Sequence, residues 1–146
     1  MKNQVLSIGQ MQKLKELGVD TSKASMCYIS KYTSCDFDDG DEIVVVCNDF
    51  NKRLYNEFGP AFTLQDIIEL LPKSISHKYE VLSTIYEDTY VLVWDMEGGV
   101  LKYCDDIGCE REYTNHAIIH VNEIGVLESL YEMLVWVAEN GYLTAK

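Results

Sequence analysis

Four residues in the last third of the chain have side chains that bind zinc. Cys104, Cys109, His116 and His120 follow one another with the spacing C-x4-C-x6-H-x3-H. Zinc fingers that use two cysteines and two histidines leave about twelve residues between the pairs. If both histidines lie on one strand, their rings share a face about 13 Å apart, too far for one ion. We therefore favour two strand histidines and two half-exposed thiols over a zinc site.

Other catalytic patterns do not occur in the sequence. His116 and His120 have the spacing of a zinc-protease helix, but Ala117 stands where that motif needs a glutamate. Nucleotide-binding glycine loops and the serine-hydrolase elbow are absent from the sequence. A small metal- or carboxylate-dependent enzyme is an alternative. It would use His77, His116 or His120, and only the types of these residues support it. We expect no cofactor.

The charge balance limits the class of partner. Lysine and arginine number 12 and acidic residues 24, so the net charge is −12. Nucleic acids and anionic membranes are bound by clustered basic residues, and the densest cluster here is Lys52-Arg53. We expect neither of those partners. Such acidity serves solubility, and it also suits a protein that meets a basic partner.

One predicted helix, over residues 124–140, carries a candidate partner-binding face. At 100° per residue, Glu128, Glu132 and Glu139 gather opposite its apolar arc, and Trp136 lies beside them. Trp136 either packs at the edge of the core or forms an exposed anchor for a partner or a second copy. The sequence also holds ten tyrosines, which suit half-buried sheet faces and interfaces alike.

Three helices are predicted, at about 7–18, 63–71 and 124–140. Ser7 and Thr63 are expected caps, Gln10 completes a capping box, and glycines end the first and last helices. Short hairpin connections between strands predict an antiparallel meander sheet packed by these three helices, an α+β fold. Ile43 to Asn48, apolar on both faces, is expected as an interior strand. Glu87-Asp88 is expected to turn the chain between strands Tyr79 to Tyr86 and Tyr90 to Met96.

The length and composition predict a single compact domain over residues 1–146. Hydrophobic residues make up 47% of the chain, which is typical of a globular protein. Two subregions are suggested within it, with a helix and hairpin over 1–58 and a helix, β-meander and helix over 59–146. Five cysteines, an odd number, favour reduced thiols, and we expect a cytoplasmic protein without membrane association.

Several segments resemble a family of small acidic proteins from gut Bacteroides-type bacteria and their mobile elements and phages. The resemblance covers most of the chain and rests on residues 6–8 with 11–22, 62–73, 130–136 and 139–143. Those segments hold caps, core positions and a helix end. The resemblance implies a compact α+β fold in a bacterial cytoplasm, and it carries no catalytic residues.

The order of elements over residues 79–140 is similar to that of HicB-type antitoxins, which are acidic proteins that neutralise small basic toxins. It is also similar to that of double-stranded-RNA-binding domains, which the acidic composition argues against. The sequence thus predicts a non-enzymatic protein-interaction module that binds a basic partner through an acidic and aromatic face. A homodimeric structural protein is a further alternative.

Overall fold

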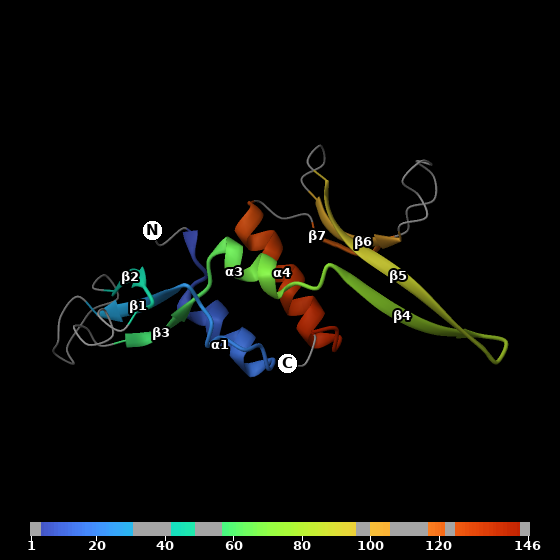
Figure 1. Cartoon of the computed structure of the whole chain (residues 1–146), viewed down its shortest axis with the longest axis horizontal. Coiled ribbons are helices and arrows are strands. Elements are labelled where there is room, and N and C mark those ends of the chain that lie inside the picture. Colours follow the sequence, from blue (N-terminus) through green and yellow to red (C-terminus); the bar gives the residue numbers. More distant parts are fainter. Residues whose placement is uncertain are drawn as a thin grey trace. The chain divides into compact units, whose positions relative to one another are not determined.

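The chain folds into two compact units. The computed structural model describes residues 4–30, 42–48, 57–95, 100–105, 117–121 and 125–143 (Figure 1). One unit is Met1–Leu70 and the other is Leu71–Lys146. This division differs from the suggested boundary after residue 58, because the Leu6 N–H donates to the Phe62 carbonyl at 3.0 Å and Val5 forms a bridge with Thr63. That the chain behaves as one domain stays a prediction.

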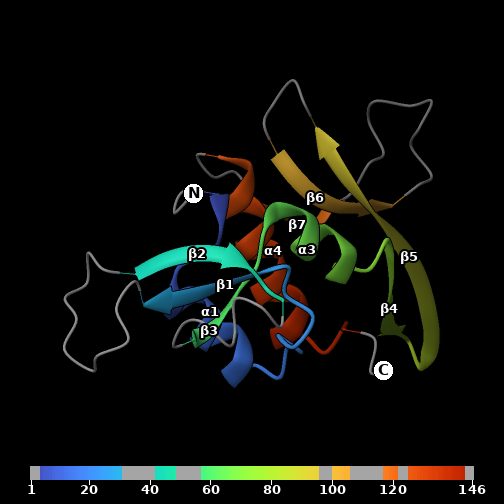
Figure 2. The same cartoon turned by 60° about the vertical axis from the view of Figure 1, so that its left-hand side comes forward.

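The described residues of the first unit form two helices and a three-stranded antiparallel sheet. Its elements are α1 (Ile8–Glu16), β1 (Met26–Ser30), β2 (Glu42–Val46), β3 (Glu57–Ala61) and α3 (Leu64–Leu70). The strand order is β2-β1-β3 (Figure 2). The capping box of Ser7 and Gln10 is confirmed, since each residue's backbone N–H donates to the side chain of the other. Gly18 follows α1 with a φ of 89°, as its role in ending the helix requires.

The prediction that residues 43–48 form an interior strand is wrong. β2 lies at one end of its sheet, and β1 is the central strand. Met26 to Ile29 in β1 are all buried, whereas Val46 in β2 is 55% exposed. A run of valines predicts a strand, but which strand becomes central depends on a third segment, β3, that pairs with β1 from far along the chain.

A carboxylate ties the start of α3 to the segment that leads into β1. Asp66 is only 7% exposed and accepts hydrogen bonds from the backbone N–H groups of Ser25 (3.0 Å) and Thr63 (2.9 Å) and from the Ser25 hydroxyl. Its own N–H donates to the Thr63 hydroxyl, which confirms Thr63 as the cap. Burial raises the pKa of Asp66, but these hydrogen bonds outweigh it and hold the pKa below its ordinary value.

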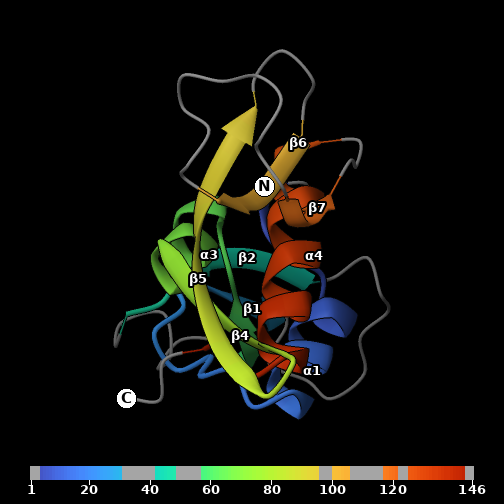
Figure 3. The same cartoon turned by 90° about the vertical axis from the view of Figure 1, so that its right-hand side faces the viewer.

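In the second unit, the residues that the structure describes place one helix against a four-stranded antiparallel sheet. Its elements are β4 (Ser74–Val81), β5 (Thr84–Asp95), β6 (Val100–Asp105), β7 (Ala117–Val121) and α4 (Val126–Glu139). The strand order follows the chain, and α4 contacts β6 and β7 (Figure 3). The core includes Tyr103, Met133, Leu134 and Val137, all fully buried. The predicted α+β class, with three helices and antiparallel strands, is confirmed, and the strands form two sheets.

The predicted turn at Glu87-Asp88 is wrong. The chain reverses at Leu82-Ser83, and Glu87 and Asp88 lie inside β5, opposite Lys78 and His77. Leu82 and Ser83 both have positive φ, 51° and 66°, which is the backbone of the tight hairpin turn that normally selects Asn-Gly. The sequence signal was misleading because leucine is a poor residue for this conformation.

Asp66→Asn is expected to destabilise the first unit by about 2 kcal/mol, because the buried carboxylate loses charge-assisted hydrogen bonds. Since the folded pKa is depressed, the stabilisation is present above the unfolded pKa of 3.8 and is lost as pH falls through the folded pKa. Hydrogen exchange of amides in α1 and β1 between pH 3 and pH 7 measures both effects.

The matched control is Asp20→Asn. Asp20 also accepts a hydrogen bond from a serine backbone, that of Ser22 at 3.0 Å, but it is exposed. Equal protection losses in the two variants would contradict the role assigned to Asp66.

Replacing Leu82-Ser83 with Asn-Gly is expected to stabilise the second unit by about 1 kcal/mol, because these residues adopt positive φ at lower cost. Both tryptophans, Trp94 and Trp136, belong to this unit, so urea unfolding followed by their fluorescence measures the change. An unchanged midpoint would mean that the turn carries no strain.

Candidate functional site

A row of aromatic rings runs through the second unit from its core to the β4–β5 hairpin. Its contacts join ring centroids of Tyr103 and Trp136 (6.2 Å), Trp136 and Tyr142 (5.3 Å), His77 and Tyr79 (6.3 Å), and Tyr79 and Tyr86 (5.5 Å). A hydrogen bond closes the remaining step, because the His77 Nδ1 atom lies 3.1 Å from the Tyr142 hydroxyl oxygen. We call these six residues the aromatic row.

The inner end of the aromatic row is fixed in the core. Tyr103 on β6 is fully buried, and its hydroxyl donates to the Pro72 carbonyl at 2.7 Å. Burial raises the pKa of Tyr103, so this phenol stays neutral and acts as a donor. The row therefore begins at a side chain with a single defined position.

The end of α4 brings Tyr142 back toward the sheet. Gly141 has a φ of 74°, and the Tyr142 N–H donates to the Val137 carbonyl at 2.9 Å. This is the backbone reversal that glycine allows after a helix. It places the Tyr142 ring on Trp136 and its hydroxyl beside His77, so one residue links the helix to β4.

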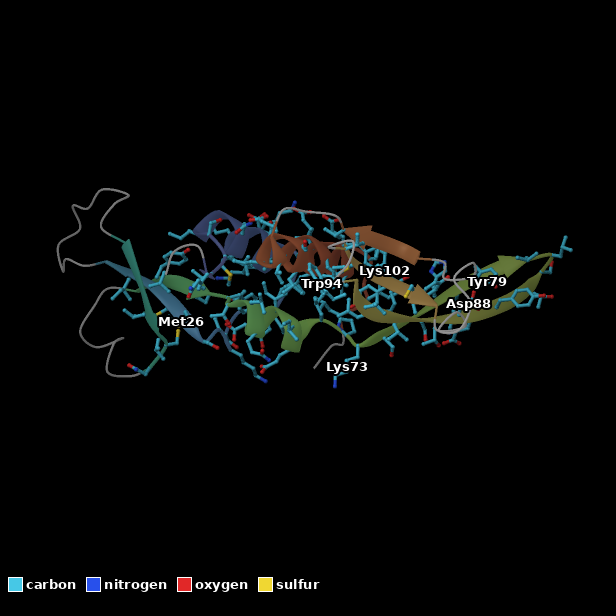
Figure 4. The ribbon with its side chains drawn as sticks, turned by 90° about the horizontal axis from the view of Figure 1, so that it is seen from above. Met26, Lys73, Tyr79, Asp88, Trp94 and Lys102 are labelled. Atoms are coloured by element: carbon cyan, nitrogen blue, oxygen red, sulfur yellow. The ribbon has the colours of Figure 1, made fainter. Side chains whose placement is uncertain are left out.

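The outer part of the row lies on one face of the hairpin, which we call the hairpin face: His77, Tyr79, Tyr86, Asp88 and Tyr90. Tyr79 pairs with Tyr86 and His77 with Asp88, so these side chains share a side of the ladder. Figure 4 shows Tyr79 and Asp88 on the same stretch of the hairpin. A hydrogen bond from the Tyr79 hydroxyl to the Asp88 carboxylate, with smaller contributions from desolvation and neighbouring charges, raises the pKa of Tyr79.

Apolar exposure is concentrated toward the tip of this hairpin. Tyr79 is 39% exposed and Tyr86 46%, and beyond them Leu82 reaches 95% and Ile85 73%. At the base, Ile75 is buried. The hairpin is thus packed at one end and open at the other, and its open end carries large apolar side chains.

The partner-binding residues predicted on α4 are split by the structure. Trp136 is half-buried between Tyr103 and Tyr142, which agrees with the core-edge interpretation. Glu128, Glu132 and Glu139 are exposed. Burial and then the charges of Glu132, Glu128 and Glu139 raise the pKa of Tyr131, so these glutamates form one negative field on α4. Partner binding there stays a prediction.

Of the four residues of the zinc hypothesis, Cys104 and His120 lie within the described residues. Cys104 is buried on β6, and the backbone of His120 on β7 lies opposite that of Lys102. Cys109 and His116 lie outside the described residues. Within the ranges that the structure describes, no group of three or more His, Cys, Asp or Glu side chains is placed to hold a metal ion.

Sequence reasoning missed the hairpin face as a unit. The abundance of tyrosine on strands was visible, but a turn at residues 87–88 would pair Tyr86 with Thr89 instead of Tyr79. In a two-stranded ladder a wrong turn changes every cross-strand pair. The only signal for the true register was the alternation His77, Tyr79, Val81, which does not by itself locate the turn.

Comparison of the chain with protein-family models, with curated proteins and with solved structures finds no match. The resemblance to proteins of gut bacteria therefore stays a prediction. Over the described part of the chain, none of the helices combines the length and the apolar character needed to span a membrane.

Trp136→Ala is expected to lower the unfolding free energy of the second unit by about 3 kcal/mol, because it removes the ring that joins Tyr103 to Tyr142. Urea unfolding followed by Trp94 fluorescence measures the loss. Glu132→Ala, one turn earlier on the same helix, is the control and should change stability by less than about 0.5 kcal/mol. A stable Trp136→Ala protein would instead mark this ring as a dispensable surface anchor.

Proposed function

We propose that this protein is a non-enzymatic interaction module that binds a basic protein partner on the hairpin face. The observation that carries the proposal is an exposed, stacked Tyr79–Tyr86 pair with the Asp88 carboxylate beside it. The sequence predicted the same kind of partner but located the contact on α4. The chemistry of the hairpin supports moving the main contact to β4 and β5.

The two tyrosines have the properties of interface anchors. Each presents a large apolar ring with a polar tip, and their stacking at 5.5 Å with an interplanar angle of 21° restricts both rings before any partner arrives. A restricted aromatic side chain loses little rotamer entropy on binding. Burying the exposed parts of Tyr79 and Tyr86 would therefore contribute to affinity with little ordering cost.

Asp88 gives the hairpin face its preference for a cation. Its carboxylate accepts a hydrogen bond from Tyr79, but an ionised carboxylate has about four acceptor sites, so it can accept further donors. A cationic side chain beside Asp88 would also meet the faces of neighbouring rings. Arginine suits this arrangement better than lysine, because the planar guanidinium both stacks on a ring and bonds a carboxylate in two places.

The charge of the whole chain supports the same class of partner. A net charge of −12 attracts basic proteins over distances of about a Debye length and repels acidic ones. The exposed glutamates on α4 add to this field. In this view, α4 contributes to the rate of encounter and the hairpin face contributes the specific contacts.

Hexa-arginine, hexa-lysine and hexa-glutamate peptides test the proposal against the isotope-labelled full chain by NMR. Hexa-arginine is expected to shift the amides of residues 77–79 and 86–90, more strongly than hexa-lysine, and hexa-glutamate to shift none. Asp88→Asn and Tyr86→Ala should each weaken arginine binding about ten-fold, because each removes one of the two recognition elements.

The matched control is Glu128→Gln with Glu132→Gln, which removes charge from α4 and leaves the hairpin intact. It should slow association and reduce its salt dependence while the shifted amides stay the same. If this variant abolishes binding and Asp88→Asn does not, the contact belongs to α4 and the hairpin assignment is wrong.

A further inference from the structure

We infer that two copies of this chain pair through the outer edge of β4, in antiparallel register, with Tyr79 facing Tyr79 of the second copy. The result is a continuous eight-stranded sheet. The inference goes beyond the proposed function, since it concerns backbone groups at the edge of β4 and not the binding of a basic partner on the hairpin face.

Among the strands that the structure describes, β4 is at the end of its sheet, and the alternation of its hydrogen bonds identifies the backbone groups that face outward. The Leu92 N–H donates to the Lys73 carbonyl at 2.9 Å, so the backbone of residue 73 faces β5. The ladder continues from Ser74 to Val81 without a register shift. In an antiparallel ladder, the backbone N–H and C=O groups of successive residues point alternately to the two sides of the strand. The backbone groups of odd-numbered residues therefore bond β5, and those of even-numbered residues face outward. The outward set is Ser74, Ser76, Lys78 and Glu80, and all four are exposed.

This edge has few of the features that prevent strand pairing. Edge strands are normally short, interrupted by a bulge, or blocked by proline and charge. β4 pairs regularly over eight residues, contains no proline, and carries one lysine. That lysine, Lys78, is followed two residues later by Glu80, so the charges on this edge are of both signs.

The order of these charges selects a second copy in one register. With Tyr79 opposite itself, Lys78 lies opposite Glu80 of the second copy, twice by symmetry. If the symmetry centre of the pairing is instead at Lys78 or at Glu80, that residue lies opposite the same residue of the second copy, so like charges meet. If the centre is at His77, Lys78 lies opposite a serine. Opposite charges directly across a ladder stabilise it and like charges destabilise it. Only the register centred on Tyr79 is therefore self-complementary.

The backbone geometry fits the same register. Lys78 and Glu80 both face outward, so they can form a hydrogen-bonded pair between copies. Tyr79 and Tyr79 of the second copy then form a non-hydrogen-bonded pair, in which opposed side chains approach more closely. Tyr79 shares a side of the hairpin with Tyr86, so this pairing joins the two hairpin faces into one aromatic surface. Inside each copy Lys78 also lies opposite Glu87, which extends the alternation of charge.

Sedimentation of the full chain from micromolar concentration to about 1 mM tests the inference, at an ionic strength of about 0.15 M. The wild type is expected to form dimers as concentration rises. Lys78→Glu and Glu80→Lys should each raise the dissociation constant about ten-fold, and the double exchange should restore it. Net-charge repulsion alone predicts opposite effects for the two single changes, since one adds negative charge and the other removes it.

The charge controls are Lys13→Glu on α1 and Glu69→Lys on α3, both exposed in the first unit, which should change dimerisation by less than about three-fold. As a second readout, Tyr79→Cys should form a disulfide-linked dimer under mild oxidation more readily than the wild type, Lys78→Cys or Glu80→Cys, since only residue 79 faces itself.

A wild type that stays monomeric over the whole range overturns the inference. So does a dimer that is indifferent to the exchange of Lys78 and Glu80. If the edge instead accepts a strand from a basic partner, hexa-arginine binding will depend on Lys78 and Glu80 while sedimentation reports a monomer. Failure of the dimer leaves the Asp88→Asn result on arginine binding unaffected, so the two proposals fail separately.

Discussion

The contact of Tyr142 with both Trp136 and His77 is the interaction on which the second unit's exposed surface depends. A two-stranded hairpin alone is marginally stable in water. Here Tyr142, just after α4, stacks on Trp136 and forms a hydrogen bond with His77 near the base of the β4–β5 hairpin. Trp136 in turn contacts the buried ring of Tyr103. Because the base is held, the outer half of the hairpin can stay ordered without a covering layer.

Because the base of the hairpin is held, its exposed aromatic side chains can keep defined positions. Tyr79 and Tyr86 stack on each other, and the Tyr79 hydroxyl is engaged by Asp88. Each of these side chains limits the rotamers of its neighbour. Their conformational entropy is therefore lost on folding, and little more would be lost on binding. The same arrangement keeps a carboxylate next to aromatic rings, which is the combination that distinguishes a cationic side chain from a neutral one.

The sequence predicted what local chemistry determines and missed what distant pairing determines. Ser7, Thr63 and Gly141 act within one helical turn, and their roles as caps or helix ends were readable. The central position of β1 depends on β3, and the burial of Asp66 depends on Ser25, 41 residues away. The hairpin turn failed for another reason. Leu82-Ser83 contradicts turn preferences, and an acidic pair nearby matched them better.

Local conflicts of this kind tend to mark places where a sequence serves something besides folding. Asn-Gly would form the same turn with less strain, and Leu82, at 95% exposure, contributes no buried area to its own unit. Ile85, 73% exposed on the opposite side of the ladder from Tyr86, adds nothing to the aromatic row either. The apolar tip therefore lowers the stability of the free chain. Both proposed contacts, of a basic partner with the hairpin face and of a second copy with the edge of β4, would bring another surface close to these exposed side chains.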